Sequence, residues 1–303
     1  MNDPIGPPEP AGRTVIVTGA SSGIGAAAAR RLASLGATVL PVGRSPRRTA
    51  EVAAEIGAEP YVADFADLAQ VRRLADTLLE RCPRIDVLAN NAGGLFAPRQ
   101  ETVDGHELTF QVNHLAPFLL TMLLTPRLRE GARERGPVRV ITTSSLGNRF
   151  GRLRLDDLEW RRRRYGGGWI AYSTTKLMNI LFTRELARRT RGTGLEAYCF
   201  HPTSEPGRRR RTPGAHRTRF ASASRPMRLL PGPVLDRIAL TAEDGAEPLV
   251  RLAGARAVPA ESGTYFHGLR PGGRINRQAD SAELARRLWE VSAEFVRSDL
   301  PPA

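Results

Sequence analysis

The sequence predicts an α/β fold built on a doubly wound parallel sheet, and two patterns carry that prediction. Short apolar segments rich in β-branched residues alternate with amphipathic segments of helical length along most of the 303 residues. A glycine-rich turn also stands directly between the first of these strands and the first helix. Because crossovers between parallel strands are right-handed, helices are expected on both faces of the sheet.

Six strands and the helices between them can be assigned in chain order. The strands are expected at residues 14–18, 38–42, 61–63, 85–89, 138–143 and 195–200. The helices are expected at residues 24–35, 46–56, 68–80, 103–129 with a kink at Pro117, and 169–189. The length suits a single domain over residues 13–303, preceded by a proline-containing disordered leader at 1–12. Glycine and proline concentrate at 201–235, which predicts a long irregular loop rather than a domain boundary.

The charge is strongly basic, because 45 Lys+Arg stand against 31 Asp+Glu for a net charge of +14. Lys176 is the single lysine, so the other 44 basic residues are arginines. Apart from runs at 161–164 and 208–211 they are scattered through helical segments, with no recognisable nucleic-acid-binding module. We therefore interpret the excess as compositional bias and expect no nucleic-acid partner.

Cysteine content and hydropathy indicate a cytoplasmic protein. Cys82 and Cys199 are too few for a disulfide framework, so reduced thiols are expected. The most apolar stretch, residues 115–124, is about half the length that crosses a bilayer. The first residues lack the basic start and apolar run of an export signal, so no membrane span is expected.

The glycine-rich turn is the first candidate binding site. Residues 18–25 read TGASSGIG, so Gly19, Gly23 and Gly25 lie between strand and helix. Glycine permits a tight turn and close approach of the backbone to a pyrophosphate, whose charge a helix N-terminus stabilises. An ordinary tight connection is the alternative. The predicted dinucleotide contacts here are Gly19, Ser21, Ser22, Gly23, Ile24 and Gly25.

The residues after the second strand indicate which dinucleotide binds. NAD-specific sites usually have a carboxylate there for the ribose 2′-hydroxyl. Here Arg44 and Ser45 follow the strand, and no acid occurs before Glu51. A guanidinium at this place suits a 2′-phosphate, so NADP(H) is preferred, with NAD as a possible cofactor. The alternative is one more surface arginine.

Tyr172 and Lys176 form the second candidate site, because a spacing of four places them on one helical face. A nearby ammonium lowers the pKa of a phenol toward a range useful for proton transfer. Such pairs are common on helices, but this one contains the only lysine of an arginine-rich chain. Arginine cannot replace a compact ammonium that must lie close to a tyrosine, so the pair indicates catalysis.

Together these motifs resemble the short-chain dehydrogenase/reductase family, and within it the retinol-dehydrogenase-like branch. The resemblance covers about residues 13–297, with an interruption at 201–220, and rests on several segments. These are TGASSGIG (18–25), NNAG (90–93), FQVNHLAPFLLT (110–121), RVITTSSLGNRFG (139–151), AYSTTKLMNILFTRELARR (171–189) and SGTYF (262–266). The resemblance implies one Rossmann-type domain with about seven parallel strands.

The resemblance also implies a catalytic set of four residues. Tyr172 would be the general acid/base, and Lys176 would tune it and bind the nicotinamide ribose. Ser145 would bind the substrate oxygen, with Ser144 as the rival for that role, and Asn113 would hold a water in the proton relay. No metal site is expected.

Further cofactor contacts follow from the same resemblance. Asp64, followed by Phe65, matches the family position that meets the adenine amino group. Asn91, Ala92 and Gly93 match the segment beside the adenosine. The alternatives are a helix cap for Asp64 and a plain turn after the fourth strand.

The chain departs from the family pattern after the sixth strand. A His-Pro-Gly turn with a threonine four residues after its glycine is usual, but here His201-Pro202 is followed by Thr203. The expected spacing returns with Gly214 and Thr218, which indicates an insertion of about eleven residues at 203–213. This insertion lies in the loop that closes over cofactor and substrate.

The expected function is hydride transfer between NADP(H) and an apolar carbonyl or alcohol substrate. The alternative is a catalytically impaired dinucleotide-binding regulator, which the altered segment after His201 would explain. The identity of the substrate and the oligomeric state stay open, and a homo-oligomer is possible.

Overall fold

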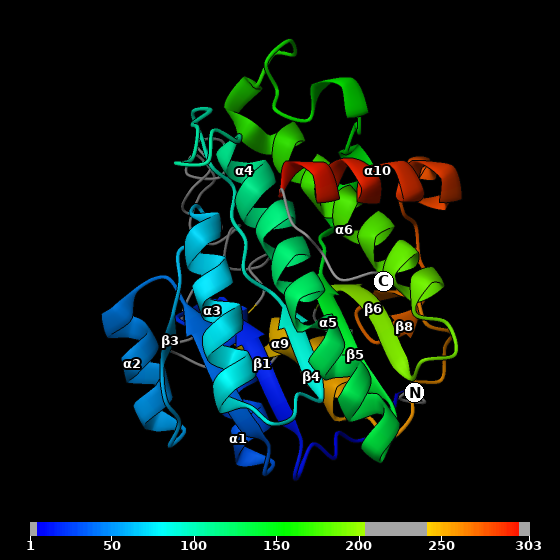
Figure 1. Cartoon of the computed structure of the whole chain (residues 1–303). Helices are drawn as coiled ribbons and strands as arrows, with labels where there is room; N and C mark the ends of the chain where they lie inside the picture. Colours follow the sequence, from blue (N-terminus) through cyan, green and yellow to red (C-terminus); the bar gives the residue numbers. More distant parts are fainter. Residues whose placement is uncertain (1–4, 204–240, 297–303) are drawn as a thin grey trace.

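The computed structural model describes residues 5–203 and 241–296 as a parallel sheet covered by helices on both faces (Figure 1). The strands are β1 (Thr14–Thr18), β2 (Thr38–Gly43), β3 (Tyr61–Val62), β4 (Val87–Asn90), β5 (Val138–Thr143), β6 (Leu195–His201), β7 (Tyr265–His267) and β8 (Arg270–Pro271). Their spatial order is β3-β2-β1-β4-β5-β6-β7-β8. The doubly wound α/β fold predicted from the sequence is confirmed.

All pairings from β3 through β7 are parallel, and only β8 runs antiparallel to its neighbour β7. The expected seven parallel strands are therefore present, and β8 is an addition that the sequence did not reveal. Its two residues follow a tight turn at Gly268, where φ is +60°. A strand of this length carries too little periodicity to predict.

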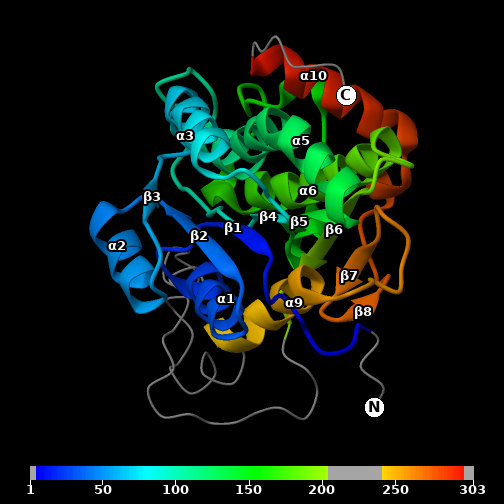
Figure 2. The same cartoon turned by 60° about the horizontal axis from the view of Figure 1, so that its bottom comes forward.

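Two helical layers enclose the sheet, as Figure 2 shows from below. One layer contains α3 (Leu68–Arg81), α5 (Ala116–Arg135) and α6 (Trp169–Arg189), with α10 (Ala282–Phe295) packed across α6. The other contains α1 (Gly23–Ser34) and α9 (Ala242–Gly254), and α2 (Pro46–Glu55) follows β2 at the edge.

The strands are buried on both faces, which explains their nearly continuous apolar sequences. Ile16 of β1 lies beside Leu40 of β2 and Leu88 of β4, and all three pack against the layer of α3, α5 and α6. The neighbours Val15 and Val17 pack on the opposite face with α1 and α9. This alternation fixes which side of each strand faces which layer.

The long helical region contains a π-helical turn where the sequence predicted a proline kink. A short helix α4 (Leu108–Phe110) leads into the π turn η1 (Gln111–Leu115), and α5 continues from Ala116. Pro117 lies in the first turn of α5, where a missing backbone N–H is tolerated. The irregularity therefore precedes the proline and includes Asn113, and π turns of this kind often occur at functional sites.

The segment expected to be a disordered leader is packed over residues 5–12. Ile5 is buried, and the Glu9 amide donates to the Gly254 carbonyl at the end of α9 over 2.9 Å. Pro8 lies so close to Gly254 that a Cβ there would approach it to 2.6 Å. The apolar Ile5 and the prolines give this segment a packing surface, so the expectation of disorder is wrong for these residues.

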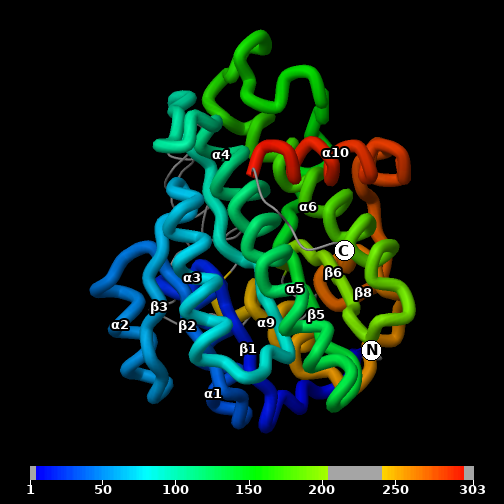
Figure 3. Tube along the Cα trace, in the orientation of Figure 1, coloured from blue at the N-terminus to red at the C-terminus, as the bar shows by residue number. Residues whose placement is uncertain are grey.

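The segment between β5 and α6 rises beside α4 in Figure 3, where it is drawn in green. It contains the 3-10 turns η2 (Leu146–Phe150), η3 (Leu155–Asp157) and η4 (Gly166–Gly168). The Tyr165 hydroxyl lies 2.8 Å from the Thr109 hydroxyl and donates to the buried Glu107 carboxylate over 2.9 Å. These bonds fasten the segment to the start of α4.

One helical stretch, Leu108–Arg135, is long and apolar enough to cross a membrane by length and composition. Its most apolar window is 89% buried inside the molecule, as in the core helix of a globular domain. The expected insertion at 203–213 falls almost wholly outside the described residues, and so does most of the loop at 201–235.

Candidate active site

The glycine-rich turn joins β1 to α1 at the carboxyl edge of the sheet. Gly19 and Gly23 have φ values of +71° and +57°, a region that side chains with a Cβ rarely adopt. A Cβ on Gly25 would lie 2.4 Å from the Gly19 carbonyl oxygen, so only glycine fits there. The Ser22 side chain makes no capping hydrogen bond at the start of α1. The helix N-terminus is thus built to accept an anion.

Thr18, the last residue of β1, ties this turn to the end of β4. Its hydroxyl oxygen accepts hydrogen bonds from the Asn91 and Ala92 amides, both over 3.0 Å. The Asn91 side chain donates in return to the Thr18 carbonyl over 2.9 Å, while Gly93 is exposed. The predicted residues 91–93 therefore lie beside the glycine turn, where the strand order reverses between β1 and β4.

Arg44 is exposed directly after β2, and its guanidinium has no carboxylate partner among residues 5–203 and 241–296. Glu51, the nearest acid in sequence, pairs with Arg47 instead. A Cβ on Gly43 would approach the Ser21 Cβ to 2.8 Å, so Ser21 of the glycine turn packs against the end of β2. Arg44 therefore lies next to the turn and is available to an anion.

Asp64 and Phe65 follow β3 at the same edge. The Asp64 carboxylate accepts the Ala66 amide over 3.0 Å, while the capping residue of α3 is Asp67. The alternative interpretation of Asp64 as that cap is therefore wrong. Phe65 is buried in the cluster that contains α3 and α5, whereas Ile24 of α1 packs against the cluster on the opposite face of the sheet.

Tyr172 and Ser145 form the centre of the candidate active site. Tyr172 is almost fully buried on α6, and a Cβ on Gly147 would lie 3.4 Å from the Ser145 Oγ and 3.6 Å from the Tyr172 ring, so the two side chains flank the same residue at the end of β5. Burial raises the pKa of Tyr172 to about 12, and the nearby Ser145 side chain only partly opposes this. The lowered pKa expected from Lys176 is therefore not present in this structure.

Lys176 directs its ammonium toward the sheet. Its Nζ donates to the Thr143 carbonyl over 3.0 Å and lies 5.6 Å from the centre of the Tyr172 ring. Burial lowers its pKa to about 8, since the charged form loses hydration. A Cβ on Gly93 would lie 3.4 Å from this Nζ, so the exposed turn after β4 leads directly to the lysine.

The two serines after β5 have different surroundings. Ser144 is buried and donates its hydroxyl to the Lys176 carbonyl over 2.8 Å, which fastens α6 to β5. Ser145 is half-exposed and caps η2, where its hydroxyl oxygen accepts the Gly147 amide over 3.1 Å. Of the two, Ser145 is the one placed beside Tyr172.

Asn113 lies in the π turn and is fully buried. Its side chain accepts from the Gly94 amide over 2.8 Å, and donates to the Gly94 carbonyl over 2.9 Å and to the Thr175 hydroxyl over 3.0 Å. The amide thus connects the turn after β4 to α6 one residue before Lys176. Thr18, Thr143 and Thr175 also contact these groups but were not predicted, because their only sequence signal is their place at strand ends or beside the lysine.

An apolar rim borders this site. Leu146 follows Ser145 and is 47% exposed, and Trp169 at the start of α6 is 40% exposed. The Trp169 ring centre lies 5.8 Å from that of Tyr172, one helical turn further along α6. Leu146 and Trp169 are two of the five large apolar side chains that are exposed among the described residues, and they adjoin Ser145 in sequence and Tyr172 in space, respectively.

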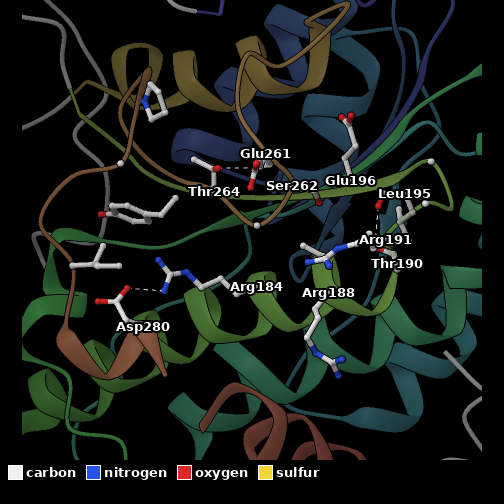
Figure 4. Close-up of a pocket in the computed structure, with 18 of the residues that line it drawn as sticks. Arg184, Arg188, Thr190, Arg191, Leu195, Glu196, Glu261, Ser262, Thr264 and Asp280 are labelled. Atoms are coloured by element: carbon white, nitrogen blue, oxygen red, sulfur yellow. Dashed lines mark hydrogen bonds and ion pairs between the residues drawn. The ribbon is translucent and has the colours of Figure 1, made fainter. Parts of the chain in front are cut away.

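A separate hollow of about 1230 Å³ lies at the other end of α6, between that helix, β6, the segment that leads into β7 and residues 271–273 (Figure 4). Arg184 at its wall pairs with Asp280, as Figure 4 shows. Arg188 pairs with Glu185 of the same helix. None of the predicted catalytic or cofactor-binding residues lines it. This hollow is therefore separate from the candidate active site, despite its size.

The described arginine run at 161–164 is partly bonded within the segment after β5. Arg163 pairs with the buried Asp157 over 3.0 Å and covers the Trp160 ring at 3.9 Å. The run at 208–211 lies outside the described residues. Among the described residues, no group of His, Cys, Asp and Glu side chains could hold a metal ion.

The fold and the site together define an α/β oxidoreductase with a dinucleotide-binding turn. The family model of the short chain dehydrogenases matches residues 13–155 of this chain. DnrU of Streptomyces sp. strain C5, named as a candidate daunorubicin C-13 ketoreductase, is 44% identical, covering 94% of this chain and 93% of its own. Human retinol dehydrogenase 13 is 36% identical, covering 96% of this chain and 86% of its own. The chain belongs to the short-chain dehydrogenase family.

Solved structures agree with this assignment. A crystal structure of a protein from Mycobacterium paratuberculosis has a TM-score of 0.74 at 35% identity and covers 97% of both chains. The NADP complex of RhlG from Pseudomonas aeruginosa has a TM-score of 0.64 at 26% identity and covers 88% of this chain and 97% of its own. The protein is thus an oxidoreductase of this family acting on alcohol or carbonyl groups, with similarity to retinol dehydrogenases and DnrU.

Proposed function

We propose that the protein is an NADP(H)-preferring reductase of apolar carbonyl compounds, with Tyr172 as the proton donor. The observation that carries the proposal is the placement of the Tyr172 and Ser145 side chains together beside Gly147, with the Lys176 ammonium close to Gly93 of the turn after β4. Two hydroxyl groups placed together in this way can both bind one carbonyl oxygen. Their donors stabilise the negative charge that develops on that oxygen during reduction.

The residues at the carboxyl edge suit a dinucleotide phosphate. Close backbone approach at Gly19 and Gly25 and the open N-terminus of α1 fit its pyrophosphate. Arg44 would bind the 2′-phosphate, with Ser21 and Ser22 nearby. The adenosine side of the cofactor would lie against Asp64, Phe65 and residues 91–93. The nicotinamide ribose would be held by Lys176 and Tyr172. When bound, the nicotinamide supplies the hydride.

The electrostatics of the pair favour proton donation. A phenol whose pKa is raised to about 12 keeps its proton at neutral pH, so Tyr172 is ready to protonate a forming alkoxide. Lys176, whose pKa is lowered to about 8, is still mainly charged at pH 7 and stabilises the tyrosinate that remains. Asn113 holds the Gly94 backbone beside these groups and would position water for reprotonation.

The apolar rim supports an apolar substrate. A carbonyl held between Ser145 and Tyr172 would extend its substituents toward Leu146 and Trp169. Burying these surfaces contributes roughly 25 cal/mol per Å². DnrU and retinol dehydrogenase 13, to which the chain is similar, are named for daunorubicin and for retinol, and both compounds contain six-membered carbon rings.

The test is oxidation of NADPH in the presence of 2-naphthaldehyde and of glyceraldehyde, with wild type and Tyr172→Phe. We expect a higher kcat/KM for 2-naphthaldehyde, and a loss of turnover of roughly 10²–10⁴-fold in the variant. NADPH affinity, measured by fluorescence, should change little, because the phenylalanine keeps the ring. Turnover near the wild-type value in Tyr172→Phe would refute the assignment. NADPH binding by the wild type without turnover of any carbonyl would favour the regulator.

A further inference from the structure

The hydroxyl of Ser145 is useful only if the start of η2 is held in one place, and a buried polar cluster lies behind it. The cluster consists of Asn148, Tyr265, His201 and Asn276. Asn148 is fully buried, and His201 is 1% exposed. None of these four residues belongs to the catalytic set or to the cofactor turn.

The orientation of the Asn148 amide follows from its partners. The Asn276 amide, which can only donate, bonds to Oδ1 of Asn148 over 3.1 Å. The Ser145 carbonyl, which can only accept, accepts a hydrogen bond from Nδ2 of Asn148 over 2.7 Å. The second hydrogen of that Nδ2 points to the Tyr265 hydroxyl oxygen at 3.4 Å. These three partners fix which side-chain atom of Asn148 is the oxygen and which is the nitrogen.

Tyr265 passes the sequence of bonds on to His201. Its oxygen accepts from Asn148, so its proton is free to bond Nδ1 of His201, which lies 2.5 Å away. The two rings stack with centres 5.6 Å apart, which keeps the tyrosine in this position. His201 then carries its proton on Nε2, a buried atom without a partner among the described residues. Burial keeps the ring neutral, because it lowers the pKa of His201 to about 4.

The cluster joins three distant parts of the chain at the catalytic serine. Tyr265 comes from β7, His201 from the end of β6, and Asn276 precedes η5 (Arg277–Asp280). Two bonds from Asn148, one from its backbone amide and one from its side chain, converge on the Ser145 carbonyl at 3.0 Å and 2.7 Å. The first turn of η2 therefore depends on the C-terminal part of the domain for its exact placement.

We propose that Asn148 and Tyr265 are positioning residues that hold Ser145 in its place beside Tyr172. This inference rests on the proposed function, because it assigns Ser145 the task of binding the substrate oxygen. Displacing such a group by a fraction of an ångström is enough to lower turnover substantially. Neither residue reaches the glycine turn, so cofactor affinity does not depend on them.

The main test compares Tyr265→Phe with Tyr198→Phe in the 2-naphthaldehyde assay. Both tyrosines are buried, but the Tyr198 hydroxyl bonds to the Ala260 carbonyl on the opposite face of the sheet. We expect Tyr265→Phe to lower kcat about 5- to 20-fold with an unchanged NADPH dissociation constant. Tyr198→Phe should keep kcat within about twofold, although it loses one hydrogen bond and therefore about as much stability as Tyr265→Phe. Equal kcat values for the two variants would overturn the proposal.

Combination with Ser145→Ala distinguishes positioning from a general structural role. If Tyr265 acts through Ser145, the effect of Tyr265→Phe disappears in the Ser145→Ala background, because the displaced hydroxyl is already absent. If the two losses multiply instead, the proposal is wrong. A Ser145→Ala variant as active as wild type would contradict the proposed function itself rather than the positioning role.

A second measurement does not require turnover. Hydrogen exchange at the Gly147 and Asn148 amides, which both bond to Ser145, should be faster in Tyr265→Phe and in Asn148→Ala than in wild type or Tyr198→Phe. Exchange at the wild-type rate in both variants would show that the cluster does not hold η2, and would refute the inference.

Discussion

Replacing Lys176 with methionine should make the protein more stable while it removes activity. The Lys176 side chain is buried, and its pKa is lowered from 10.5 to about 8 because the charged form loses hydration. At 1.36 kcal/mol per pKa unit, this difference corresponds to a cost of about 3 kcal/mol to folding at neutral pH. The loss of its bond to the Thr143 carbonyl offsets about 1 kcal/mol. That carbonyl keeps the Asn179 side chain as a partner at 3.2 Å, so it is not left unsatisfied.

The expected net gain of Lys176→Met at pH 7 is therefore about 2 kcal/mol in the free energy of unfolding. Its pH dependence has a definite sign. Between about pH 8 and 10.5 the unfolded wild type binds more protons than the folded one, so wild-type stability rises with pH relative to the variant. The advantage of the variant should be complete below about pH 8 and should shrink as the pH rises above it.

Urea unfolding followed by circular dichroism, from pH 6 to 9.5 without cofactor, measures this difference. Tyr172→Phe is the control, because the folded-state pKa of about 12 lies above that range and its difference from wild type should stay flat. The Cys199 thiol interacts electrostatically with Lys176, so the comparison is repeated in a Cys199→Ala background, in which this thiol does not titrate. A Lys176→Met variant that is less stable than wild type, by an amount independent of pH, would refute the reasoning.

Two further substitutions test the cofactor turn. Gly25→Ala should weaken NADPH binding at least tenfold, because its Cβ would lie 2.4 Å from the Gly19 carbonyl oxygen. Gly57→Ala is the control, since this glycine lies in an exposed turn with no atom within 4 Å of the added Cβ. A comparable loss of NADPH affinity in both variants would contradict the argument from close backbone approach. Arg44→Ala should raise the NADPH dissociation constant roughly tenfold or more and that of NADH less than twofold, as measured by titration calorimetry. Arg47→Ala, which removes an exposed arginine already paired with Glu51, is the control. Equal effects of Arg44→Ala on both dinucleotides would exclude a contact with the 2′-phosphate.

Local sequence patterns determined the class of fold and the two chemical motifs. Strands of the central sheet are buried on both faces, so their apolar runs are visible without knowledge of their neighbours, and Val138–Thr143 and Trp169–Arg189 were predicted to the residue. The glycines at 19, 23 and 25 report a backbone geometry that only glycine adopts or fits. A spacing of four between Tyr172 and Lys176 is likewise a property of one helix.

Only the tertiary structure decided which neighbours these residues have and what that does to their chemistry. Burial of Tyr172 raises its pKa, although the sequence pattern predicted a lowered one, because desolvation depends on the layers packed around α6. The choice of Ser145 over Ser144 beside Tyr172, and the π turn at Asn113 in place of a kink at Pro117, also arise from contacts between separate elements. The cluster of Asn148, Tyr265, His201 and Asn276 brings together residues up to 128 positions apart, which no periodicity reveals. Sequence motifs record local backbone demands, whereas long-range hydrogen bonds and burial are properties of the packed fold.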